Sequence, residues 1–183
     1  RNDAFGECQI FGMKANMLNN RFTAETDEAY EMVDLLCEMI FNPYLVDGAF
    51  DGEFTSGEKI NLIDTIEAEV NNKGQYAIKR LMSEMCKDEV FGLSKTGEIK
   101  DVEKITKESL YEAYKKAISK YKIEIYFVGS LDINKAVEQF KARFANIERN
   151  PINIEDAEIK MAADYVKEVV DTEKVNQGKL VLG

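Results

Sequence analysis

The strongest constraint on the fold of this chain is that its hydrophobic residues follow two different periods. Between Cys8 and Leu18 they alternate, which predicts a half-buried strand with Phe11, Met13, Ala15 and Met17 on one face. The segment from Ile123 to Phe127 alternates in the same way. Elsewhere apolar residues recur every three or four positions, as on an amphipathic helix. The chain therefore has a mixed α/β order.

The first helical segment, residues 26–43, carries clear signals at both ends. Asp27 and Glu28 lie in its first turn, where acids favour the helix dipole, and Pro43 follows its last turn. Its apolar positions are Tyr30, Val33, Cys37 and Ile40. Residues 44–57, with three glycines, read as a loop or a poorly formed helix start.

The second helical segment has a stripe formed by Ile60, Ile63, Ile66 and Val70. Asn71, Asn72 and Gly74 interrupt it before a helix resumes over residues 75–87. Two later helices are predicted after N-caps at Thr106 and Asp132, the second with Ile133, Val137, Phe140 and Phe144 on one face. Weak strands are predicted at residues 165–170 and 178–183.

Composition excludes several classes of protein. The chain has 183 residues, 45% hydrophobic and 32% charged, which fits neither a disordered nor a membrane protein. No apolar run reaches the roughly 18 residues of a membrane span. A net charge of −10 disfavours nucleic-acid binding. We expect neither a nucleic-acid nor a membrane partner.

The cysteines and the absence of histidine limit the chemistry. Cys8, Cys37 and Cys86 are far apart, and no histidine is present to complete a zinc site or to act as base for a nucleophile. The cysteines are interpreted as reduced, buried thiols, which favours a cytoplasmic location. On a helical projection Glu67 lies at the edge of the apolar stripe, either as a half-buried acid with a perturbed pKa or as a carboxylate that reaches solvent.

Several segments together resemble one known family. These are "EMIFNPYL", "FDGEFTSGEKINLIDTIEAEVNNKGQYAIKRLM", "GEIKDVEKITKESLYEAY" and "IYFVGSLD". Their order is similar to that in the insulinase-like zinc peptidases, which include pitrilysin and mitochondrial processing peptidase, from about Glu7 to Gly183. The resemblance implies an α+β fold, with an antiparallel-rich sheet covered on one side by helices, as in one domain of a clamshell half.

The resemblance also locates a metal-ligand position. Active members bind zinc through a His-x-x-Glu-His helix and a glutamate on a later helix. Here Glu58 and Lys59 open the match to the later helix, and Thr65 stands where the ligand glutamate belongs. Because a threonine hydroxyl is a poor zinc ligand, we expect a degenerate site with no catalytic residue, no bound metal and no cofactor. A match shifted by two residues makes Glu67 the ligand, and zinc is expected only under that alternative.

The resemblance implies an organisation for the chain. Residues 1–150 are expected to form an insulinase-like peptidase domain that lacks its N-terminal part. Residues 151–183 are expected to be a linker followed by the first strand of a further domain. The chain begins at Arg1 and ends on the strand-like "GKLVLG", so it reads as a fragment of a longer protein.

Three functions follow as hypotheses. The first is a non-catalytic bacterial family member that binds an extended peptide or forms a hetero-oligomer with an active homologue. The second is an active zinc metallopeptidase subunit whose main metal-binding motif lies upstream. The third is an unrelated acidic α/β interaction module.

Overall fold

The computed structural model describes residues 2–5, 8–18, 22, 28–130, 132–154, 162, 165–172, 174 and 176–183. The chain divides into two compact units. Unit 1 comprises residues 12–55 and 106–154, and unit 2 comprises residues 2–11, 56–105 and 155–183.

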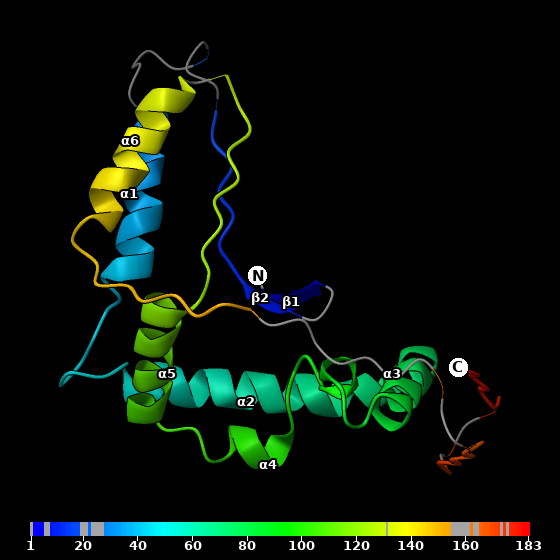
Figure 1. Ribbon diagram of the computed structural model, residues 1–183. Helices are drawn as coiled ribbons and strands as arrows, with labels where there is room; N and C mark the ends of the chain where they lie inside the picture. Colours follow the sequence, from blue (N-terminus) through cyan, green and yellow to red (C-terminus); the bar gives the residue numbers. More distant parts are fainter. Residues whose placement is uncertain are drawn as a thin grey trace. The chain divides into compact units, whose positions relative to one another are not determined.

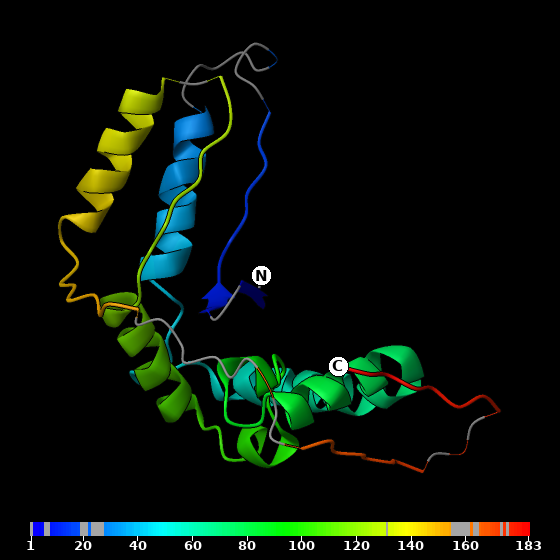
Figure 2. The same cartoon turned by 45° about the vertical axis from the view of Figure 1, so that its right-hand side comes forward.

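Unit 1 is built around a pair of helices, α1 (Glu28–Phe41) and α6 (Ile133–Phe144), which lie side by side in both ribbon views (Figures 1 and 2). Their shared core contains Tyr30, Val33, Cys37 and Ala136, all buried. At one end the rings of Phe41 and Phe144 meet edge to face, with centroids 4.9 Å apart. At the surface Arg143 Nε donates to Asp34 Oδ1 at 2.8 Å.

The N-caps predicted for the two later helices are confirmed. Helix α5 (Lys107–Lys120) starts with a capping box, in which the hydroxyls of Thr106 and Ser109 accept from each other's backbone N–H. Asp132 caps α6 by accepting from the N–H of Asn134. The core face of α6 differs from the predicted one, because Ala136 is 1% exposed whereas Val137 is 40% exposed. The small side chain lets the backbones of α1 and α6 approach closely.

Helix α2 (Gly52–Ala68) begins earlier than predicted. The carboxylate of Asp51 accepts from the N–H groups of Glu53 and Phe54, at 2.8 and 3.0 Å, and acts as an N-cap within the segment expected to be a loop or a poorly formed helix start. The predicted interruption is confirmed, since a 3-10 turn, η2 (Glu69–Asn71), precedes helix α3 (Lys73–Met85), and Asn72 caps α3 by accepting from the N–H of Gln75.

Unit 2 continues from α3 through short elements. A 3-10 turn, η3 (Val90–Gly92), and the one-turn helix α4 (Ile99–Val102) follow. Gly92 lies against the end of α3 so closely that an added Cβ would be 2.1 Å from the carbonyl oxygen of Cys86. Cys86 and, in unit 1, Cys37 are buried, as predicted, whereas Cys8 is only partly buried.

Hydrogen bonds and an ion pair between side chains connect residues 165–172 to α3. Asp171 Oδ2 accepts from the hydroxyl of Tyr76 at 2.9 Å and from Nε of Arg80 at 3.1 Å. One helical turn further on, Lys167 forms an ion pair with Glu84. The alternate residues Val166 and Val170 are exposed. Part of this segment was predicted as a strand, but it forms no ladder and polar side chains hold it in place.

The prediction of an antiparallel-rich sheet is wrong for the part of the chain that the structure describes. The only ladder there joins β1 (Asn2–Phe5) and β2 (Cys8–Phe11), with Asn2 opposite Phe11. The other predicted strands, residues 12–18, 123–127, 165–170 and 178–183, have no regular secondary structure and form no ladder. Alternation fixes which side chains share a face, whereas a strand also needs a neighbouring backbone to bond with.

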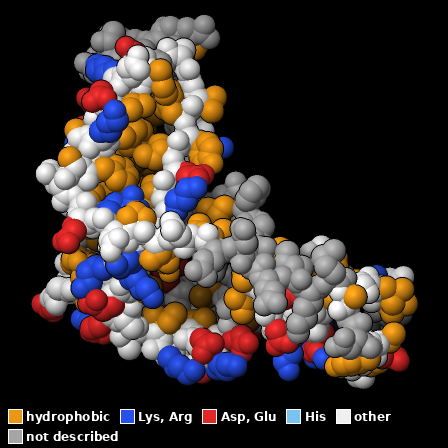
Figure 3. Space-filling model, viewed as in Figure 1, with side chains coloured by type: hydrophobic (Ala, Val, Ile, Leu, Met, Phe, Trp, Pro, Cys, Tyr) orange, Lys and Arg blue, Asp and Glu red, His pale blue; other side chains and the backbone are white. Residues whose placement is uncertain are grey.

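Apolar side chains are correspondingly open to solvent in these segments. Tyr126 is 84% exposed and Val128 98% exposed. In the space-filling view, hydrophobic side chains gather on the surface of unit 1 beside α6 (Figure 3). None of the described helices is both long and apolar enough to cross a membrane.

Candidate functional site

The residues predicted for a degenerate metal site lie on α2. Thr65 is exposed, and its hydroxyl donates to the carbonyl oxygen of Asn61, one turn earlier, at 2.7 Å. The hydroxyl hydrogen of Thr65 is therefore used in a hydrogen bond within its own helix.

The alternative ligand, Glu67, is exposed and lies two positions further, so it faces roughly the opposite side of the helix from Thr65. The stripe expected beside it is only partly covered, because Ile60 is 61% exposed while Ile63 and Ile66 are half-buried. The structure does not bring Thr65 and Glu67 together on one surface.

The donor set of this chain does not fit a zinc site. Family sites of this kind need histidine, and the chain has none. Among the described residues no three histidine, cysteine, aspartate or glutamate side chains are grouped so that they could hold a metal ion. We therefore derive no chemical step through zinc from these residues.

Sequence reasoning missed a polar cluster next to the predicted site. Glu69, in η2, binds two partners: Thr96 Oγ1 donates to its Oε1 at 2.7 Å, and Lys79 forms an ion pair with its Oε2. Ser94 lies 3.1 Å from Thr96 and extends the cluster. A pattern search misses the cluster because its members are spread over 28 positions and meet only when the chain folds back.

The electrostatics of the cluster favour a structural role. Partial burial works to raise the pKa of Glu69, but hydrogen bonds from Lys79 and Thr96 outweigh it and the pKa is lowered. A carboxylate with a lowered pKa is a weak base, so Glu69 is poorly suited to remove a proton near neutral pH. It links η2 to α3 and to the loop before α4.

Another lysine of the family-like motif has a clear structural partner. The ammonium group of Lys59 donates to the carbonyl oxygens of Glu103 and Ile105, at 2.9 and 2.7 Å. These carbonyls follow the end of α4, so Lys59 joins α2 to the connection that leaves α4. The motif that opens the match to the peptidase helix therefore supports the fold.

Comparison with known proteins supports the resemblance to one family. The family model "Peptidase M16 inactive domain" matches residues 104–183. A protein of Bacillus subtilis (strain 168), "Probable inactive metalloprotease YmfF", is 35% identical over 181 residues, which is 97% of this chain. The chain is therefore similar to the insulinase-like peptidase family.

The insulinase-like chain also matches a solved structure. A crystal structure of a conserved protein from Enterococcus faecalis V583 superimposes on 73% of the chain with a TM-score of 0.66 and 26% sequence identity. The chain spans 42% of the length of the Bacillus relative and 32% of the Enterococcus chain. These comparisons extend over most of the insulinase-like chain and agree with the resemblance seen in its motifs.

Proposed function

We propose that this chain is part of a non-catalytic insulinase-like protein that pairs with an active zinc-peptidase homologue and holds peptide for it. The proposal is carried by Thr65, which lies at the position predicted for the family's ligand glutamate and whose hydroxyl donates to the carbonyl oxygen of Asn61. The name of the Bacillus relative, a probable inactive metalloprotease, supports the same conclusion.

The contacts of the helix that carries Thr65 support a scaffolding role. Lys59 bridges α2 to the residues after α4, and Glu69 bridges its end to α3 and Thr96. These contacts hold the elements of unit 2 together without a metal. Helix α2 therefore stabilises unit 2 even in a protein that has lost the metal chemistry.

The composition supports a peptide-holding role. With a net charge of −10, the chain attracts basic segments over a distance of about one Debye length, roughly 8 Å in physiological salt. Its free, buried thiols suit a reducing compartment, so we place the protein in the cytoplasm.

Co-expression tests the pairing. The full polypeptide is expressed with a homologue from the same genome that carries His-x-x-Glu-His, and the complex is isolated through a tag on this chain. We expect a mixed complex that contains both polypeptides and cleaves peptide. Recovery of this chain without the homologue, at concentrations where the homologue is soluble, would contradict the pairing.

A further inference from the structure

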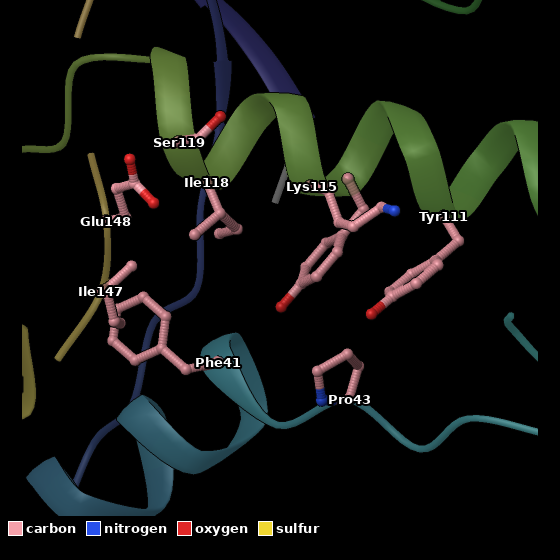
Figure 4. A pocket seen from close by; sticks show the side chains of 9 residues that line it. Phe41, Pro43, Tyr111, Lys115, Ile118, Ser119, Ile147 and Glu148 are labelled. Atoms are coloured by element: carbon pink, nitrogen blue, oxygen red, sulfur yellow. The ribbon is translucent and has the colours of Figure 1, made fainter. Parts of the chain in front are cut away.

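Unit 1 contains a hollow that has no role in the function proposed above. It has a volume of about 220 Å³ and lies between the end of α1, the second half of α5 and the residues that follow α6 (Figure 4). This volume is below the range of about 300 to 1,000 Å³ typical of small-molecule pockets. It is suited to a single side chain.

The walls of the hollow are aromatic and aliphatic. Phe41 and Pro43 line it from the end of α1, Ile118 lines it from α5, and Ile147 lines it from the residues after α6 (Figure 4). The ring of Tyr114 stacks against that of Tyr111, with planes 15° apart. Tyr114 is fixed further because its hydroxyl donates to the carbonyl oxygen of Ile40. These are walls on which the methylene groups of a long side chain can pack.

The rim of the hollow is held by a set of hydrogen bonds at the end of α5. Arg149 Nε donates to the carbonyl oxygen of Ile118 at 3.0 Å. The N–H groups of Asn150 and Ile152 donate to the carbonyl oxygens of Ser119 and Lys120, each at 2.9 Å. These bonds satisfy carbonyls that the helix end leaves free, and they fix the chain next to Glu148.

The charges around the hollow leave one carboxylate unpaired. The ammonium of Lys115 lies 2.6 Å from Glu112 and 4.9 Å from the centre of the Tyr111 ring. The guanidinium group of Arg149 donates hydrogen bonds to the backbone carbonyl oxygens of Ile118 and Tyr121. Glu148 is exposed and makes no hydrogen bond or ion pair with any residue that the structure describes. The free charge at the rim is therefore negative.

We propose that the hollow binds the arginine side chain of a peptide segment. The methylene stem lies on Ile118 and Phe41, and the guanidinium pairs with Glu148. A planar guanidinium can also stack on aromatic faces, which favours arginine over lysine. The proposal rests on the peptide-holding part of the proposed function and adds the side chain that is selected.

Calorimetric titration of the full polypeptide with three peptides tests this inference. The peptides are acetyl-Ala-Ala-Xaa-Ala-Ala-amide, with arginine, lysine or citrulline at Xaa. Citrulline keeps the shape of arginine and lacks its charge. We expect the arginine peptide to bind at least five times more tightly than the citrulline peptide, and more tightly than the lysine peptide. Equal affinity for arginine and citrulline overturns the proposal, and equal affinity for lysine overturns the choice of arginine.

Two variants place the binding at the hollow. Glu148→Gln is expected to remove the preference for arginine over citrulline. Glu31→Gln, an identical change at an exposed position of α1, is expected to keep it. An unchanged preference in Glu148→Gln, or an equal loss in both variants, overturns the assignment. Zinc content and peptidase activity, measured on the same samples, test the non-catalytic function separately, because neither depends on Glu148.

Discussion

The ammonium nitrogen of Lys59 lies 2.7 Å from the carbonyl oxygen of Ile105, across 46 positions of sequence. A second carbonyl oxygen, that of Glu103, accepts from the same group. Lys59 follows Glu58 in the motif that marks the family's ligand helix. The contact gives this part of the motif a structural role in unit 2.

Replacing Lys59 with methionine keeps the aliphatic stem and removes the bridge. We expect the free energy of unfolding to fall by about 1 to 2 kcal/mol, because hydrogen bonds from a charged group to two carbonyls are lost. Denaturant titration measures the change. The control is Lys100→Met, since Lys100 is 70% exposed in a surface ion pair with Glu98 and its loss is expected to leave the free energy of unfolding almost unchanged. Equal effects of the two variants would contradict the bridging role.

Two glycines of unit 2 are predicted to respond in opposite directions. Gly92→Ala forces a Cβ to within 2.1 Å of the carbonyl oxygen of Cys86, so we expect a loss of more than about 2 kcal/mol. Gly57 lies inside α2, where an added Cβ meets nothing within 4 Å, so Gly57→Ala is expected to stabilise by about 0.5 to 1 kcal/mol. Thermal unfolding of both variants gives the comparison. If Gly92→Ala unfolds at the same temperature as the wild type, residue 92 does not lie this close to the carbonyl oxygen of Cys86.

The Glu69 cluster predicts a pH dependence of stability. Hydrogen bonds from Lys79 and Thr96 outweigh partial burial and keep the pKa of Glu69 below its ordinary value of 4.5. A lowered folded-state pKa gives stability that is present above the unfolded-state pKa and is lost as pH falls through the folded-state pKa. Glu69→Gln should therefore be less stable than the wild type at pH 7, by about 1 kcal/mol, and the difference should disappear in acid well below pH 4.5.

Denaturant titrations of wild type and Glu69→Gln across this range of pH make the comparison. Glu67→Gln is the matched control, because Glu67 is an exposed acid on the preceding turn. A difference between wild type and Glu69→Gln that persists unchanged in acid would contradict the ionised cluster.

The sequence predicted the helices better than the strands, for a physical reason. Helix ends depend on residues a few positions apart, and Thr106, Asn72 and Asp132 all lie where the chain turns into a helix. Three nearby glycines favour a loop or a poorly formed helix start around Asp51, although its carboxylate starts α2. Strands depend on partners distant in sequence, so alternation at residues 123–127 did not establish a sheet.

For the candidate site, too, the sequence indicates features formed by adjacent residues and not those formed by distant segments. The prediction for Thr65 could be made from the sequence, because the match around Glu58 and Lys59 rests on adjacent residues. The Glu69 cluster and the hollow beside Glu148 were not foreseen, since each combines side chains from three separate segments. The expected domain boundary near Pro151 and the role of Thr65 as a degenerate ligand stay predictions.

The most direct test of the central claim is the zinc content of the full polypeptide, purified alone and examined by native mass spectrometry alongside a peptide-cleavage assay. We predict a metal-free polypeptide that does not cleave peptide by itself, with no change on Glu67→Gln. Stoichiometric zinc and chelator-sensitive cleavage, both lost in Glu67→Gln, would contradict the account and identify Glu67 as a ligand.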